Sequence, residues 1–133
     1  MTGPGALKPL RHPRLWLALW AIALLVVVVV CLVPAPDLPN TPPGGDKIEH
    51  ALAYFLLAAS AVQLFATRRA LIFAGIGLLV LGVLIEFAQG AFTTTRSGDA
   101  WDAVADAVGV VLGLALARTP LRDLLARFDA PRG

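Results

Sequence analysis

Residues 15–33 form a run of nineteen residues without a charged side chain, and this run constrains the fold more than any other feature. About twenty apolar residues are enough to cross the hydrocarbon core of a bilayer as a helix. A cleaved signal peptide is the competing interpretation, because Lys8, Arg11 and Arg14 precede the run. A signal peptide usually has a shorter apolar core, of about 7–15 residues, so we favour a retained membrane span.

Three more apolar segments follow the first one along the chain. The sequence is 58% hydrophobic and 15% charged, whereas a soluble domain has about 45–50% apolar and about 25% charged residues. We therefore predict an all-α integral membrane bundle of four transmembrane helices, which together form one membrane domain over residues 15–117. The four predicted spans cover residues 15–33, 48–66, 70–92 and 99–117.

The two ends of the chain differ from this domain in composition. Residues 1–14 combine basic side chains with Gly and Pro, so we predict a disordered basic head. Residues 118–133 are predicted to be an amphipathic tail that contains a short interfacial helix over 120–128, beginning at Thr119 and Pro120 as N-cap and first helical residue.

The distribution of charge predicts the orientation in the membrane. With the N-terminus in the cytoplasm, nine of the eleven basic residues lie on the cytoplasmic side, and only Lys47 and Arg96 lie outside. Both termini are then cytoplasmic, and seven of the nine acidic residues fall in the outer half. Because the basic residues lie beside apolar runs, membrane lipids and not nucleic acid are the expected partners.

This topology brings polar side chains from three helices to one depth near the outer surface. Charged side chains inside a membrane almost always face the bundle interior or a water-filled cavity. We therefore expect an outward-facing polar pocket, lined by Asp46, Lys47, His50, Glu86, Gln89, Arg96, Asp102 and Asp106.

Several of these positions also have a purely structural interpretation. Asp46 and Asp99 suit helix N-caps, and Lys47 at a helix mouth commonly extends to lipid headgroups. Asp102 and Asp106 lie too deep in the last span to act as caps. Glu86 lies far from the start of its helix, so a functional or structural ion pair is expected there.

The same residues limit the chemistry that the pocket can perform. One histidine lies among several acids without HxxxH or ExxH spacing, so neither a metal site nor a cofactor is predicted. Cys31 lies within the first span, and nothing supports a serine or cysteine nucleophile. General acid–base chemistry by His50, with Glu86 or Asp102 as its partner, is the catalytic hypothesis.

Small residues predict close helix packing below the pocket. Ala105, Gly109, Gly113 and Ala117 recur at every fourth position of the last span. Such a stripe lets the backbones of membrane helices approach closely. The glycine-rich third span is a candidate partner surface.

Three motifs occur in a fixed order within residues 46–117. Asp46-Lys47-x-x-His50 opens the second span, Glu86-x-x-Gln89 ends the third, and Arg96-Ser97 leads into Asp102-x-x-x-Asp106-x-x-Gly109-x-x-x-Gly113. In this combination the chain resembles the VanZ-like family of small bacterial membrane proteins. The resemblance implies a multi-pass protein of the bacterial inner (plasma) membrane, whose relatives include proteins associated with lowered sensitivity to teicoplanin.

The family often has Asn where this chain has Asp106, which leaves open whether Asp106 is charged or protonated. The leading hypothesis is that the pocket binds a cell-envelope lipid, a lipid-linked envelope precursor or a glycopeptide antibiotic. One alternative is a membrane-embedded acid–base enzyme that acts on a lipid or isoprenoid-linked precursor. The other is a structural or regulatory membrane subunit whose polar cluster only fixes helix packing.

Overall fold

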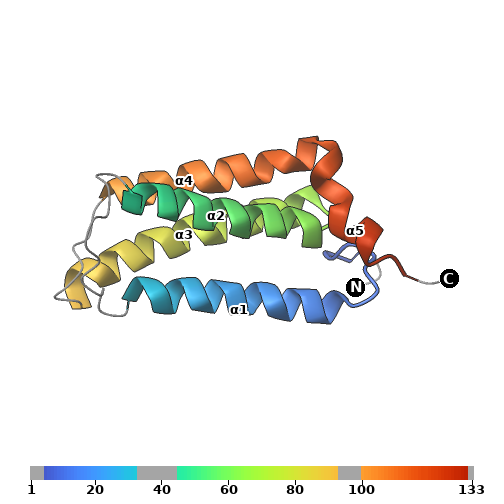
Figure 1. Cartoon of the computed structure of the whole chain (residues 1–133), viewed down its shortest axis with the longest axis horizontal. Coiled ribbons are helices and arrows are strands. Elements are labelled where there is room, and N and C mark those ends of the chain that lie inside the picture. The colour runs from blue at the N-terminus through green and yellow to red at the C-terminus, as the bar shows by residue number, and fades with distance from the viewer. Residues whose placement is uncertain (1–4, 33–44, 93–99, 132–133) are drawn as a thin grey trace.

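The computed structural model describes residues 5–32, 45–92 and 100–131, and these residues are all-helical without a β-strand. The predicted all-α class is confirmed. Four long helices run side by side along the molecule (Figure 1). They are α1 (Pro13–Leu32), α2 (Gly45–Leu64), α3 (Arg68–Phe92) and α4 (Ala100–Leu114). The short elements η1 (Ala115–Arg118), η2 (Pro120–Asp123) and α5 (Leu124–Phe128) complete the chain.

Three helices are long and apolar enough to cross a membrane: Pro13–Leu32, Arg68–Ala91 and Ala100–Arg118. The helix α2 is not among them, because its first turns contain Lys47, Glu49 and His50 and its last turn contains Gln63. Three helices therefore support the prediction that the chain is a membrane protein. The remaining predicted span, residues 48–66, corresponds to α2.

The outer surface of the bundle is apolar and part of the interior is polar. Phe87 is 71% exposed and Val111 is 63% exposed, whereas Asp106 is 2% exposed. No residue of α1 is buried. A protein in water would cover such apolar surface, whereas lipid solvates it at no cost. This distribution is the one expected for a helix bundle in a bilayer.

The closest helix packing joins α2 to α4 through two glycines. A Cβ atom at Gly113 would lie 2.6 Å from the Ala58 Cβ and 2.6 Å from the Phe55 carbonyl oxygen. A Cβ atom at Gly109 would collide with the backbone of Ala51 and Phe55. The predicted stripe of small residues therefore does allow close approach, but its partner is α2 and not the third span.

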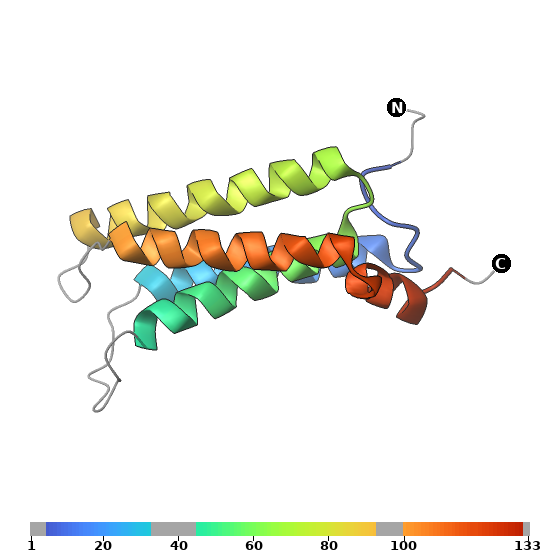
Figure 2. The same cartoon turned by 90° about the horizontal axis from the view of Figure 1, so that it is seen from above.

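The segment before α1 and the segment after α4 lie at the same end of the bundle (Figure 2). The segment before α1, which the sequence predicts to be disordered, pairs with the end of α2 instead: the Lys8 backbone N–H donates to the Leu64 carbonyl at 2.8 Å. After α4, Thr119 caps η2 by accepting from the Leu121 backbone N–H at 3.2 Å, and Pro120 follows it. The predicted start of the tail helix is confirmed.

Candidate functional site

At the end of the bundle opposite the two termini, α2 and α4 begin and α3 ends (Figure 1). Each of the three helices therefore contributes residues at the same level. Asp102, Asp106 and Glu86 are all less than one-tenth exposed. We call His50, Glu86, Asp102 and Asp106 the polar cluster.

The shortest contact in the polar cluster joins α2 to α4. The His50 Nδ1 lies 2.9 Å from the Asp106 Oδ1, and the two side chains are 13% and 3% exposed. An ionised carboxylate can only accept, so with Asp106 in this form the Nδ1–H of His50 donates to it. This bond orients the imidazole ring and leaves Nε2 directed at the other acids.

Asp102 lies one turn before Asp106 on α4 and contacts two side chains of α2. Its Oδ1 is 3.3 Å from the Lys47 Nζ, and its Oδ2 is 3.8 Å from the His50 Nε2. The Lys47 side chain is 36% exposed and the Asp102 side chain is 8% exposed. The ion pair therefore connects the buried acids to the surface of the bundle.

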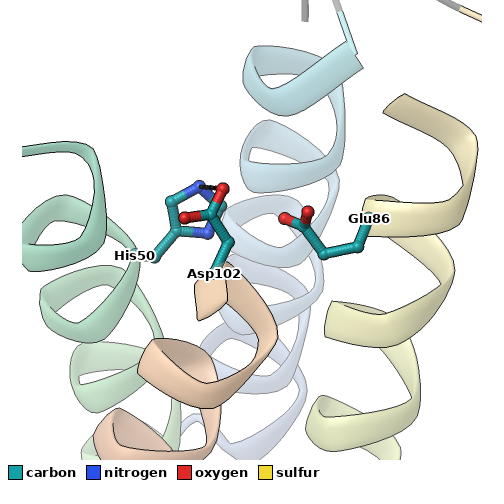
Figure 3. A group of neighbouring side chains, drawn as sticks. All are labelled: His50, Glu86 and Asp102. Atoms are coloured by element: carbon teal, nitrogen blue, oxygen red, sulfur yellow. Dashed lines mark ion pairs between the residues drawn. The ribbon is translucent and has the colours of Figure 1, made fainter. Parts of the chain in front are cut away.

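Glu86 reaches the same point from α3 (Figure 3). Single ligand atoms of His50, Glu86 and Asp102 all lie within 4.8 Å of one another. Glu86 is 8% exposed although its neighbour Phe87 is 71% exposed, so the acid faces the bundle interior. Three helices thus present one nitrogen and two carboxylates to a common volume.

Two residues that the sequence analysis did not assign to the pocket shape the polar cluster. Gly82 makes room for Asp106, because a Cβ atom at position 82 would lie 2.7 Å from the Asp106 Oδ2. Tyr54 follows His50 by one turn of α2 and is 1% exposed, and its hydroxyl makes no hydrogen bond within the described residues. The four-residue spacing from His50 is the sequence signal for Tyr54, whereas Gly82 has none.

The remaining predicted pocket residues are not part of the polar cluster as the structure describes it. Gln89 is 2% exposed, but its Nε2 donates to the Cys31 carbonyl of α1 at 2.8 Å, which ties two helix ends together. Arg96 lies outside the described residues, and so does the Asp99 that we assigned to capping. Asp46 belongs to α2, but its side chain is likewise not described.

An apolar pocket of about 230 Å³ lies beside the polar cluster, between α1 and α2. His50 and Tyr54 lie on its wall together with the exposed Glu49. Its other lining residues are apolar or weakly polar: Val26, Val27, Val30, Cys31 and Ala53. The apolar walls of the pocket therefore adjoin the imidazole of His50, which the Asp106 carboxylate orients.

Within the described residues, three buried carboxylates share this volume with one lysine and one histidine. Removing each charged side chain from water costs several kcal/mol, and the attraction within a buried ion pair often does not offset that cost. Apolar side chains of similar size would pack the bundle at lower cost. The polar cluster has the properties of a site: a donor that a hydrogen bond orients, several acceptors and a cation at the rim.

No protein-family model, curated protein or solved structure matches this chain.

Proposed function

We propose that the chain is a four-span, VanZ-like protein of the bacterial inner membrane, with both termini in the cytoplasm. The apolar outer surface and the polar interior of the bundle support α2 as the fourth membrane-spanning helix. Its polar residues His50 and Lys47 contact α4, while Ile48 and Leu52 on the same helix are 70% and 55% exposed. In this arrangement α2 turns its apolar side to lipid and its polar side to the interior.

In this orientation the polar cluster lies in the outer half of the membrane, and its proposed function is to bind the polar head of a cell-envelope lipid or lipid-linked precursor. The observation that carries the proposal is the junction of the apolar pocket with the polar cluster at His50. The pocket suits part of a hydrocarbon chain, and the acids suit hydroxyl or amine groups of the head. Lys47 suits a phosphate at the rim.

Sequestering or presenting such a lipid would lower sensitivity to glycopeptides of the teicoplanin class, which bind cell-wall precursors. The test is teicoplanin susceptibility of a sensitive bacterium with and without the gene, and with the variants His50→Ala and Glu86→Gln. His12→Ala is the matched control, because His12 is the second histidine of the chain and lies exposed at the opposite end.

The proposal expects the wild type and His12→Ala to raise the teicoplanin concentration needed for inhibition, and the two cluster variants to lose this effect at unchanged protein level in the membrane. Loss of the cluster variants from the membrane would favour the structural subunit instead. Unchanged susceptibility on expression of the wild type would contradict the resistance role.

The hydrogen bond between His50 and Asp106 favours a second candidate function, an acid–base enzyme that acts on the same lipid. A carboxylate that accepts from one ring nitrogen makes the other nitrogen a better base. Purified protein in detergent would then convert a lipid-linked precursor at a rate that His50→Ala abolishes. Binding of the precursor without turnover would decide for the binding function.

A further inference from the structure

The carboxylates around His50 Nε2 favour a positive charge at that point. Asp106 accepts the hydrogen bond of the Nδ1–H, so in a neutral imidazole Nε2 carries the lone pair, and the Asp102 Oδ2 lies 3.8 Å from it. Glu86 lies within the same 4.8 Å group. A lone pair that faces two carboxylates is repulsive unless a proton or a metal cation lies between them.

We propose that His50, Glu86 and Asp102 bind a divalent cation of the zinc class. The donor set of one imidazole and two carboxylates suits this ion, with water in the remaining position. Zinc ligands lie about 2.0–2.2 Å from the metal, so two ligands of a tetrahedral site are about 3.4 Å apart. The ligand atoms of His50, Glu86 and Asp102 are separated by up to 4.8 Å. Side-chain shifts of about 1 Å would bring them to the separation that a tetrahedral site needs.

Asp106 has the role of an orienting residue in this site. Histidines that bind metals almost always donate their other N–H to a carboxylate or carbonyl, which fixes the ring and raises its basicity. The 2.9 Å contact between the His50 Nδ1 and the Asp106 Oδ1 has this geometry. Gly82 supports it, because a larger residue would displace the Asp106 carboxylate.

Tyr54 provides an independent observation beside the same volume. Its hydroxyl is buried and makes no hydrogen bond within the described residues, although burying such a group unsatisfied costs about 1–3 kcal/mol. Tyr54 and His50 line the same pocket. A water molecule bound to the cation would provide the partner that the hydroxyl lacks.

The inference rests on the proposed role of the polar cluster as a site, but it is tested without lipid. The probe is Zn²⁺ titrated into metal-stripped protein in detergent, with bound metal measured by calorimetry and elemental analysis. One ion per chain is expected. Glu86→Gln and Asp102→Asn retain side-chain size, and each should weaken binding at least about 10-fold. His50→Ala should weaken it at least about 100-fold.

The orienting role of Asp106 needs a readout that simple packing would not move. Asp106→Val should weaken Zn²⁺ binding about 10–100-fold, as expected for loss of an outer partner of a ligand. Asp106→Asn retains an oxygen acceptor for the Nδ1–H and should restore most of the affinity. Equal loss in both variants would show that the hydrogen bond to Nδ1 is not what matters.

His12→Ala and Asp123→Asn are the matched controls, since they remove a histidine and a carboxylate from the opposite end of the bundle. The inference is overturned if no ion binds, or if the cluster variants bind Zn²⁺ as the wild type does. The proposed function fails separately: it would be contradicted by protein that binds Zn²⁺ with the expected pattern but has no lipid binding and no effect on susceptibility.

Discussion

The two ends of the bundle both contain ion pairs, but they use them in opposite ways. At the end with the polar cluster, the His50 and Asp106 side chains are 13% and 3% exposed. At the other end, Lys8 pairs with Asp123 at 2.9 Å, and the two side chains are 11% and 40% exposed. Lys8 also donates to the Arg122 carbonyl. We call this second group the terminal clasp.

The terminal clasp has an evident structural purpose. It joins the start of the chain to its last helices, and Asp129 adds to it by accepting from the His12 backbone N–H and the Trp16 Nε1, each at 2.9 Å. In the pair of Lys8 and Asp123 only the Asp123 carboxylate keeps substantial contact with solvent, and pairs with such contact contribute little to stability and cost little to form. The polar cluster is costly to bury and joins no chain end, so the comparison indicates that its charges serve function.

The largest expected effect comes from breaking a pair at the buried end. Asp106→Val leaves His50 without its oriented acceptor, and removing one partner of a buried pair costs about 3 kcal/mol or more. The measurement is the free energy of unfolding in mixed detergent micelles, followed by helical circular dichroism. Asp123→Val at the terminal clasp is the control and should cost less than about 1 kcal/mol. Equal costs would remove the distinction between the two ends.

A smaller effect is expected from filling the space beside Asp106. Gly82→Ala puts a methyl group where 2.7 Å separates it from the Asp106 Oδ2, and overpacking of this kind costs about 1–3 kcal/mol. Gly77→Ala is the matched control on the same helix, because nothing lies within 4 Å of its Cβ position. The control should be neutral or stabilising by up to about 1 kcal/mol, as helix propensity predicts. Unfolding of the two variants under the same conditions checks this difference.

The terminal clasp should respond weakly to mutation and strongly to salt. Lys8→Ala is expected to cost less than about 1 kcal/mol, since its partner Asp123 is partly exposed to solvent. Most of this cost should disappear in about 1 M salt, where the screening length is about 3 Å. Unfolding at low and high salt measures it. A cost that salt does not change would show that Lys8 acts through burial of its carbon chain.

The smallest effect concerns pH at the terminal clasp. The hydrogen bond from Lys8 lowers the pKa of Asp123 below its ordinary value. A carboxyl whose pKa is lower in the folded state stabilises the fold above its unfolded pKa, and the contribution is lost as pH falls through the folded pKa. The stability difference between wild type and Asp123→Asn should therefore be present at pH 7 and vanish in acid. A difference that grows in acid would contradict the direction of the shift.

Much of the molecule follows from patterns within single segments. Long uncharged runs predict membrane helices, and Thr119-Pro120 predicts the start of the tail helix. The gathering of His50, Glu86, Asp102 and Asp106 followed from topology, because antiparallel helices return to the same level.

Other features depend on contacts between segments far apart in the sequence. The sequence around Gly82 does not predict its contact with the Asp106 carboxylate of the next helix. Similarly, the sequence around Gln89 does not predict its hydrogen bond to the Cys31 carbonyl. The pairing of residues 6 and 8 with the end of α2 could not be predicted either, because backbone hydrogen bonds do not depend on particular side chains. His50, Glu86 and Asp102, the ligands of the proposed metal site, lack local spacing because each comes from a different helix.

The most direct test of the central claim replaces the His50–Asp106 pair with apolar residues. In His50→Leu/Asp106→Val both partners are removed at similar volume, so no hydrogen-bonding group of the pair is left unsatisfied. We predict a free energy of unfolding equal to or above that of the wild type, together with loss of Zn²⁺ binding and of the effect on teicoplanin susceptibility. A double variant that unfolds far more easily than the wild type would show that the pair is there to hold the bundle together, and would contradict the account.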